Sequence, residues 1–397
     1  MSTPSAIQRQ LDLIIRGLRD RQSLGKRKRS GHVAQTEITI DREAVDTATR
    51  YLERIGKAIS RLADPFRTLN GIIATGCIPV ESPEIQCLEE PARLEHLRFV
   101  EAYNILIKRL PGFQSLINEF QKNEYGTQWE SLLQDLSHMS GLCRSNDTSS
   151  LKKCPRLLLD EADPTPPELQ SVDKSSRGFN SPICAKLLCP IKYANQPDAI
   201  QRIRDGTIKV RASIWPSFVY EDGSYDPDNM DHGLLRGRLL VRVMRHIFTG
   251  PNTAMKPSQK LARGCNARKL AITQVTPNMI AYAAVQARVM LSAANSWTNE
   301  DGDFILSVFY DRIINLFRDD EGGEWTQQTS GWWNRQVFPC IETVYNENED
   351  EDEEEDLRLK RQRLQRVNRA QQAQMGAGTQ TGEGAAQTGD GGHMGEV

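Results

Sequence analysis

The sequence predicts an all-α protein with a helical N-terminal region, a compact C-terminal helical domain and a disordered tail. Apolar residues recur at steps of three and four along most of the chain, which is the period of an amphipathic helix. Long runs of alternating polar and apolar residues, which would indicate several β-strands, do not occur. The most strand-like segment, 208–220, contains Pro216, and a proline confines such a segment to a sheet edge or a loop.

At 397 residues the chain is long enough for two domains. Its hydrophobic fraction is 38%, which suggests that a polar tail dilutes an ordinary core. No stretch approaches the roughly 18 consecutive apolar residues that indicate a membrane-spanning helix. The N-terminus also lacks the charged start and apolar run of a secretory signal. The sequence therefore predicts a soluble, intracellular protein without a membrane contact.

Residues 1–40 combine a predicted helix with a basic segment. Apolar residues at helical steps predict the helix over 5–22. Four consecutive bases follow, flanked by glycine and serine: Lys26, Arg27, Lys28 and Arg29. Import receptors bind short basic runs of this kind as extended peptides, so we predict a nuclear localisation signal. A solvated loop in a cytoplasmic protein is the alternative.

Residues 41–141 are predicted to be a helical region. Its first helix spans 41–63, with Asp41 as the N-cap and Asp64 followed by proline as the end. The apolar positions of this helix alternate three- and four-residue steps, the spacing of a seam against another helix. Because the seam is short, packing within the fold is favoured over a free coiled coil.

Two further amphipathic helices complete this region, and a linker follows them. One helix is predicted over 91–109, and the other over 127–139, where Thr127 opens a capping box. Residues 142–190 then lose the helical pattern and contain clusters of proline, serine and glycine. Such clusters predict a linker or a long surface loop.

Residues 191–345 are predicted to form a compact helical domain. Amphipathic patterns predict its helices over 197–205, about 231–248, 277–293 and 300–317. The third of these begins with a strong signal, because Thr276 can cap the helix and Pro277 suits its first position.

One basic patch lies in the stretch HGLLRGRLLVRVMRHIF. Spacings of four and seven place Arg238, Arg242 and Arg245 on one face of a helix, opposite its leucine, valine and isoleucine residues. Clustered guanidinium groups could contact phosphates or a protein partner. The alternative is an amphipathic helix whose arginines are solvated. Residues 347–397 carry twelve acids and six bases, a net charge of −6. Because the whole chain has a net charge of −2, residues 1–346 carry only about +4.

Two adjacent tryptophans stand near the end of the predicted domain, in SGWWNRQVFP. Neighbouring residues of a helix lie about 100° apart, so Trp332 and Trp333 cannot share one narrow face. Burial of both requires a helix that is covered on two sides, or a partner that covers one of them. We predict that the pair belongs to the core, with a binding hot spot as the alternative.

The segment 346–397 begins with nine acids among the ten residues 347–356, and six bases follow. Acids placed four residues before bases stabilise an exposed helix, and the order of charges matches the helix dipole. A contact with a basic partner is the alternative. The remainder is rich in glycine and is predicted to be disordered.

Neither a catalytic residue, a metal site nor a cofactor is predicted. The closest cysteines, Cys184 and Cys189, have no second pair nearby to complete a zinc site. The acidic loop that begins at Asp226 lacks the glycine and the glutamate of a calcium loop. His232 and His246 lie too far apart for a shared site, and no nucleophile elbow or Gly-rich phosphate loop occurs.

Three stretches in this order resemble an uncharacterised domain family that is expanded in mushroom-forming (basidiomycete) fungi. They are GLLRGRLLVRVMRHIFTGP, NARKLAITQVTPNMIAYAAVQARVMLSA and GWWNRQVFP. The resemblance covers about residues 190–340. It implies the nucleus or cytoplasm of a fungal cell, and it carries no activity or site residue with it.

These features predict a non-enzymatic helical protein of the nucleus that acts through contacts with an unknown protein partner. The alternative is a nucleic-acid-associated protein, linked to mobile elements, that uses the arginine face.

Overall fold

The computed structural model describes residues 13, 16, 17, 42–110, 112–120, 126–159, 165–166, 169, 174–222, 224–256, 261 and 264–339. All of them fall in one compact unit, Ser2–Val344. The basic segment Lys26–Arg29 and the tail 346–397 lie outside the described residues, as does most of the predicted helix 5–22.

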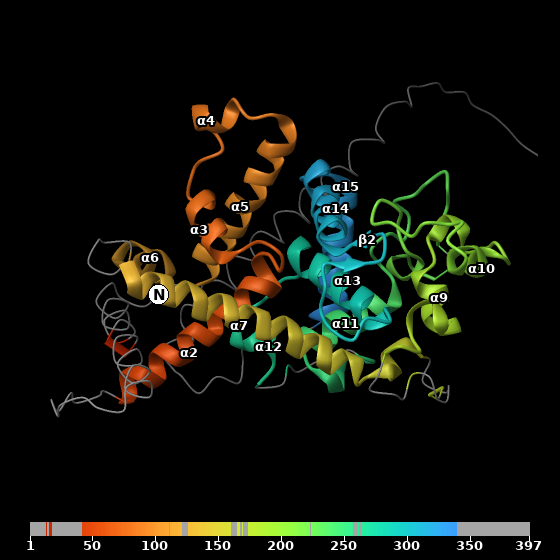
Figure 1. Ribbon diagram of the computed structural model, residues 1–397, viewed down its shortest axis with the longest axis horizontal. Coiled ribbons are helices and arrows are strands. Elements are labelled where there is room, and N and C mark those ends of the chain that lie inside the picture. The colour runs from red at the N-terminus through yellow and green to blue at the C-terminus, as the bar shows by residue number, and fades with distance from the viewer. Residues whose placement is uncertain are drawn as a thin grey trace, which may run out of the picture. The chain divides into compact units, whose positions relative to one another are not determined.

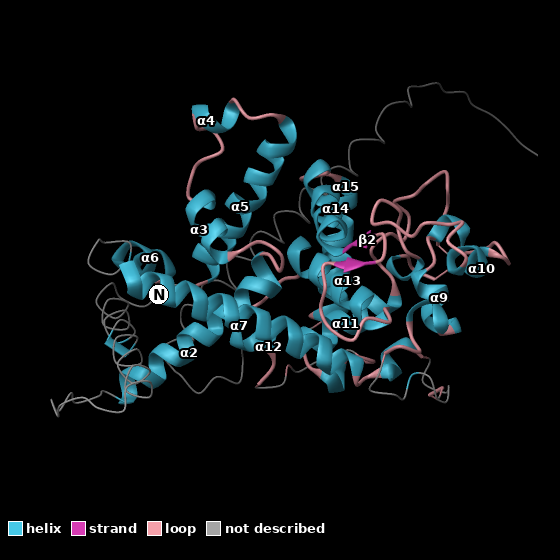
Figure 2. Cartoon of the chain, viewed as in Figure 1, coloured by secondary structure: helices cyan, strands magenta, loops and turns pink. Residues whose placement is uncertain are grey.

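The described residues are mainly helical, which confirms the all-α class (Figures 1 and 2). The longer helices are α2 (Arg42–Ala58), α3 (Leu69–Gly76), α5 (Glu90–Arg109), α6 (Phe113–Phe120), α7 (Gly126–Lys152), α11 (Arg238–Phe248), α13 (Pro277–Leu291), α14 (Leu306–Asp319) and α15 (Glu324–Val337). The shorter α-helices are α4 (Pro83–Gln86), α9 (Pro182–Leu188), α10 (Ala199–Arg204) and α12 (Asn266–Lys269).

Single helical turns and one small hairpin complete the described part of the chain. The turns are the π-helix η1 (Ile59–Ala63) and the 3₁₀ helices η3 (Pro155–Leu158), η4 (Gly178–Asn180), η5 (Ile191–Tyr193), η6 (Ser217–Val219) and η7 (Pro251–Thr253). The hairpin pairs β1 (Glu300–Asp301) with β2 (Phe304–Ile305) in antiparallel register. The strand-like segment 208–220 forms no strand; it contains η6 and isolated bridges at Pro216 and Tyr220.

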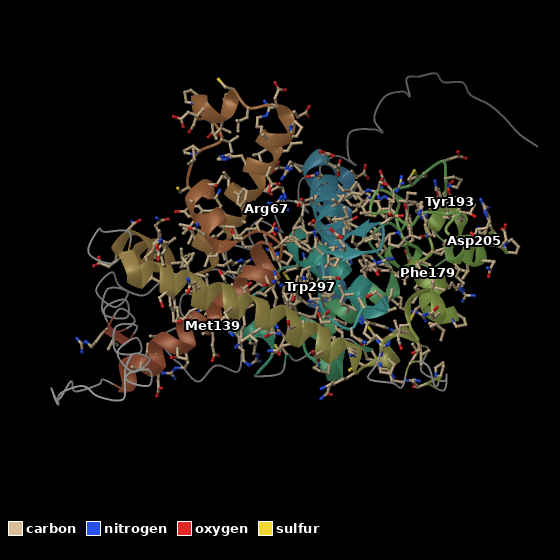
Figure 3. The ribbon with its side chains drawn as sticks, viewed as in Figure 1. Arg67, Met139, Phe179, Tyr193, Asp205 and Trp297 are labelled. Carbon is tan, nitrogen blue, oxygen red and sulfur yellow. The ribbon has the colours of Figure 1, made fainter. Side chains whose placement is uncertain are left out.

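The helix predicted over 41–63 is confirmed, and it packs against α7 of the same chain. Helix α2 continues through η1, and Asp64 ends the run in an extended conformation. Gly56 allows the two helices to approach closely, because a Cβ at this position would lie 2.6 Å from the Cβ of Met139 on α7 (Figure 3). The alternating spacing of the apolar residues therefore serves helix packing within the fold.

Helix α7 continues past residue 142 to Lys152, so the prediction of a linker over 142–190 was wrong for its first part. The buried side of this extension carries Cys143, Asp147 and Thr148 beside its few large apolar residues. Polar side chains can be buried when they are hydrogen-bonded. A helix that buries such residues lacks the regular apolar spacing by which a helix is predicted from sequence.

Two buried cations from the second part of the segment 142–190 bind carbonyl oxygens at the C-terminal end of α13. Lys174 donates from Nζ to the carbonyl oxygens of Val289 and Ala294, the latter at 2.6 Å. Arg177 donates from Nη1 to the carbonyl oxygen of Met290 at 3.2 Å. Cations here satisfy carbonyls that a helix end leaves unpaired, and they oppose the negative end of the helix dipole. Burial lowers the pKa of Lys174 to about 8.

Helix α13 is the centre of the C-terminal helices. Every residue from Asn278 to Leu291 is buried, and the helix contacts α7, α11 and α14. The predicted N-cap is confirmed, since the Thr276 side chain accepts a hydrogen bond from the backbone N–H of Met279. Helices α11, α13, α14 and α15 lie close together in Figure 1.

Two predicted helices begin later than expected. The helix predicted over 231–248 begins only at Arg238, because Gly237 passes directly against the preceding loop. A Cβ on Gly237 would lie 2.0 Å from the carbonyl oxygen of Phe218. The helix predicted over 300–317 begins after the hairpin, which uses its first residues.

A buried polar network joins the N-terminal helices to the C-terminal ones. Arg61 of η1 forms a two-point ion pair with Asp147 of α7, at 2.9 and 2.6 Å. The Tyr282 hydroxyl on α13 donates to the same carboxylate at 2.8 Å, and Gln286 donates to Tyr282 at 3.0 Å. Burial raises the pKa of Tyr282 well above its usual value, so this hydroxyl remains a donor. The predicted N-terminal region and C-terminal domain therefore share one interior.

A second set of ion pairs makes the same connection nearer the surface. Arg67, labelled in Figure 3, pairs with Asp64 at 2.8 Å and with Asp311 of α14 at 3.1 Å. Arg98 of α5 also donates to Asp311, at 3.2 Å. One carboxylate of α14 thus pairs with Arg98 of α5 and with Arg67 in the bend between η1 and α3.

Candidate functional site

The predicted arginine face of α11 is largely covered by the rest of the fold. Arg242 is 9% exposed and Arg245 is 6% exposed. Arg242 donates from Nη1 to the carbonyl oxygens of Leu157 and Leu159, at 3.0 and 2.7 Å. A buried guanidinium needs such acceptors, because it can offer five N–H donors. The interpretation of these arginines as solvated or phosphate-facing was wrong for these two residues.

Arg245 connects α11 to α15. Its Nε donates to the carbonyl oxygen of Gln336 at 2.8 Å, and its Nη2 donates to Oε1 of the same residue at 3.0 Å. Burial lowers the pKa of Arg245. The neighbouring Asn334 accepts from the backbone N–H of Val275 at 2.8 Å. The polar residues after the tryptophans therefore fix α15 in place.

The two tryptophans have different environments. Trp333 is fully buried, whereas Trp332 is only half-buried, so the prediction that both belong to the core was wrong for Trp332. The rings meet edge to face, with centroids 5.4 Å apart. The guanidinium of Arg236 lies 5.7 Å from the centre of the Trp332 ring, which is within the range of a cation–π contact.

A groove with a volume of about 490 Å³ opens between α11 and α15. We call it the Arg–Trp groove, and its lining includes Glu221, Asp222, Arg236, Arg238, Val241, Arg242, Arg245, Met255, Trp332 and Gln336. Arg238 is 46% exposed at its edge, 3.7 Å from the 75% exposed carboxylate of Asp222. The structure therefore brings all three predicted arginines and one of the two predicted tryptophans to one site.

The accessible chemistry of the Arg–Trp groove is mixed. Arg236 and Arg238 supply positive charge, Trp332 and Met255 supply apolar surface, and an acidic rim lies beside them. Arginine, tryptophan and methionine are enriched at protein–protein interfaces, and exposed arginine and tryptophan often dominate the binding energy. Such a groove can bind an apolar side chain that has an acidic group next to it.

Sequence reasoning missed Arg236, Met255 and the acidic rim. Arg236 stands in the quoted arginine stretch, but the expected helix placed it away from the other arginines. The left-handed backbone of Leu235, with φ of 59°, turns the chain before α11 begins. The Arg-Gly-Arg sequence at 236–238 was the available signal that the helix begins later.

A serine–histidine contact elsewhere has the distance of a nucleophile–base pair. Ser150 Oγ lies 2.7 Å from Nε2 of His246. In a catalytic triad a third group orients the histidine through its other nitrogen. Nδ1 of His246 has no acceptor within the part of the chain that the structure describes. Within the described ranges, the contact therefore has no partner that could orient the histidine as in a triad.

Metal-ligand side chains and cysteines are scattered. No group of three or more His, Cys, Asp or Glu residues in the described ranges is arranged to hold a metal ion. None of the seven cysteines that the structure describes takes part in a disulfide. Among the described helices, none combines the length and the apolar character needed to cross a membrane.

None of the curated proteins or solved structures compared with the chain matches it. The model of a family of unknown function (DUF6698) matches residues 138–338. This segment begins inside α7, earlier than the resemblance over 190–340 indicated, and ends directly after α15. It contains every residue that lines the Arg–Trp groove. The chain belongs to this family of unknown function.

Proposed function

We propose that this protein is a non-enzymatic binding protein that acts through protein–protein contacts. Its Arg–Trp groove receives a segment of a partner protein in which an apolar side chain stands next to acidic residues. The observation that carries the proposal is the position of Trp332, which is half-buried beneath the guanidinium of Arg236 and is flanked by the exposed Arg238.

The charges of the groove support a protein partner more than a nucleic acid. Arg242 and Arg245 direct donors to backbone carbonyls of the fold, so these donors are unavailable to phosphates. Glu221 and Asp222 line the same groove and offset the charges of Arg236 and Arg238, so the groove lacks the uncompensated positive charge that contact with several phosphates requires. A peptide with both apolar and acidic groups can contact the aromatic surface of Trp332 together with the guanidinium groups of Arg236 and the 46% exposed Arg238.

The test uses the full chain and a displayed library of random peptides. We expect the selected peptides to be enriched in acidic residues beside an aromatic or aliphatic one. Their affinity, measured by fluorescence anisotropy, should fall by about tenfold or more in Trp332→Ala and in Arg238→Glu, which is the typical effect of losing a binding hot spot. Arg211→Glu is the matched control, because Arg211 is an exposed arginine outside the groove.

Two results would overturn this proposal. One is a library that yields no peptide whose binding depends on Trp332. The other is salt-sensitive binding of mixed DNA or RNA that Arg238→Glu abolishes, which would favour the nucleic-acid-associated function. Charge reversal of Arg242 or Arg245 is unsuitable here, because both side chains support the fold.

We further propose that the protein acts in the nucleus of a fungal cell. The support is the basic run Lys26–Arg29 in the sequence and the resemblance to a family of mushroom-forming fungi. A fusion with a bulky fluorescent reporter should enter the nucleus, and alanine at all four positions should leave it in the cytoplasm. An unmutated fusion that stays cytoplasmic, or an alanine variant that still enters, would remove this assignment.

A further inference from the structure

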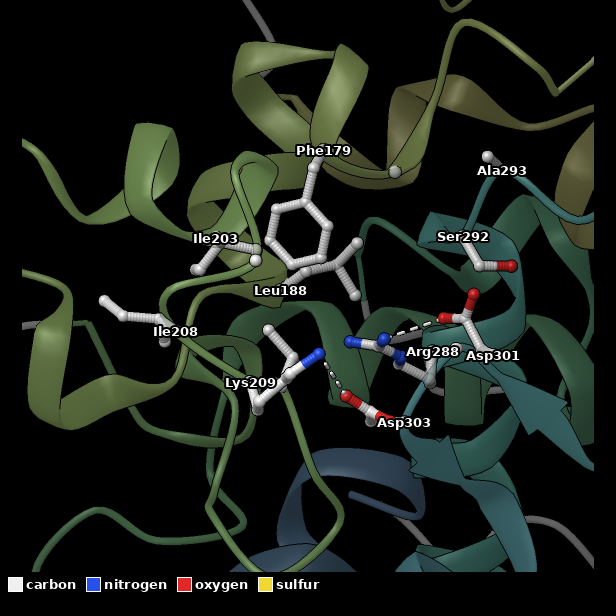
Figure 4. A pocket seen from close by; sticks show the side chains of 14 residues that line it. Phe179, Leu188, Ile203, Ile208, Lys209, Arg288, Ser292, Ala293, Asp301 and Asp303 are labelled. Carbon is white, nitrogen blue, oxygen red and sulfur yellow. Dashed lines mark hydrogen bonds and ion pairs between the residues drawn. The ribbon is translucent and has the colours of Figure 1, made fainter.

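A second hollow, separate from the Arg–Trp groove, lies at the C-terminal end of α13. Its volume is about 280 Å³, and it is bounded by η4, α9, the segment after α10 and the β1–β2 hairpin (Figure 4). This volume is at the lower end of the range of ligand pockets, so it suits a small molecule.

Arg288 supplies the polar wall of this hollow. It projects from the last turn of α13 and is 2% exposed. Its Nη2 donates to Oδ2 of Asp301 at 2.7 Å, and its guanidinium lies 4.2 Å from the centre of the Phe304 ring. Figure 4 shows the guanidinium between Asp301 and the apolar side chains of the opposite wall.

Two nitrogens of this guanidinium lack acceptors. Nε and Nη1 of Arg288 are buried and have no hydrogen-bond partner within the described residues. A buried donor without a partner is unfavourable, and more so when the group is charged, so each such case requires an explanation. These two nitrogens lie on opposite sides of the guanidinium, so a ligand oxygen at the inner end of the hollow would satisfy one of them.

The opposite wall is apolar. It is formed by Phe179, Leu188, Ile203 and Ile208, which Figure 4 places on the far side of the hollow from Asp301. Leu188 is 1% exposed and Ile208 is 5% exposed. A ligand that fits both walls therefore has one polar end and one apolar body.

The charges around the hollow limit the polar end to a single negative charge. Asp301 already neutralises part of the charge of Arg288, and Asp303 stands at the rim, paired with Lys209 at 3.5 Å. These two bases and two acids balance, so a doubly charged phosphate would be repelled more than a carboxylate. Lys209 and Asp303 are 58% and 50% exposed, and such exposed pairs are weak enough to move when a ligand enters.

We propose that this hollow binds a small monocarboxylate with a compact apolar body. The carboxylate accepts a hydrogen bond from one of the two unpartnered nitrogens of Arg288, and the apolar body contacts Phe179, Leu188 and Ile203. This site is independent of the Arg–Trp groove and of the partner proposed for it.

The experiment uses the full chain with benzoate and hexanoate as probes, and with benzyl alcohol, hexanol and inorganic phosphate as comparisons. Binding is measured by saturation-transfer NMR and by the shift of the thermal midpoint. Both carboxylates should bind about tenfold or more tightly than the matched alcohols, because a carboxylate forms a charge-assisted hydrogen bond with a guanidinium. Phosphate should not compete with benzoate.

Two variants test the position of the site without removing Arg288. Ile203→Trp fills the hollow from a half-buried position and should abolish benzoate binding. Val308→Trp is the matched control, because Val308 is 48% exposed on α14 and does not line the hollow, so binding should be unchanged. Equal affinity for carboxylates and alcohols, no binding of either carboxylate, or unchanged binding by Ile203→Trp would each overturn the proposal.

Discussion

Replacing Trp333 with alanine is expected to lower the free energy of unfolding by about 3–5 kcal/mol, the usual cost of removing a large buried aromatic side chain. Trp333 is 0% exposed and is the largest of the fully buried side chains. Its Nε1 has no acceptor in the described part of the chain, so the Trp333 side chain stabilises the fold through packing. Urea unfolding followed by far-UV circular dichroism measures the loss without relying on tryptophan fluorescence.

Trp332→Ala is the matched control for this prediction. Its ring is half-buried and open to the Arg–Trp groove, so a clearly smaller loss of unfolding free energy is expected. Equal losses for the two variants would contradict the different environments of the two rings. A stability close to that of the parent for Trp333→Ala would show that this residue does not complete the core.

Replacing Asp147 with alanine is expected to destabilise the protein by about 3–5 kcal/mol, because it leaves a buried charge without its partner. Arg61 is 6% exposed, and its two-point ion pair would be lost together with the acceptor of the Tyr282 hydroxyl. Thermal and urea unfolding both measure this change. The exposed pair Lys57–Glu53 provides the control, since Glu53→Ala should cost less than about 1 kcal/mol.

A double variant tests whether the unpaired charge of Arg61 causes the loss of stability in Asp147→Ala. Arg61→Met combined with Asp147→Leu removes both charges and should recover part of the stability that Asp147→Ala loses. If the double variant were less stable than Asp147→Ala, the stranded charge of Arg61 would not be the cause of the loss.

Helix ends that carry a strong local signal, such as a capping residue or a proline, were predicted correctly from the sequence. The helix predicted over 41–63 ends where Asp64 and the following proline indicated, and α13 begins at the predicted cap, Thr276. These features depend on a few neighbouring residues, so one sequence is sufficient. The extension of α7 was missed because Asp147 and Thr148 are buried through partners on distant helices.

The Arg–Trp groove could be predicted only in part. The sequence identified Arg238, Arg242 and Arg245 as one helix face, and the structure keeps them near one groove. Which arginines are buried against the fold depends on the carbonyls that surround the helix, and these belong to Leu157, Leu159 and Gln336. Residues so far apart in the chain leave no common pattern in the sequence.

The two hydrogen bonds from Arg245 to Gln336 have a consequence for the rate and entropy of binding. They hold α11 and α15, the two walls of the Arg–Trp groove, in a fixed relation. A ligand that enters a preformed groove loses little affinity to the ordering of protein segments. Association should therefore be limited by diffusion and by removal of water from Arg236 and Arg238, without a slow conformational step.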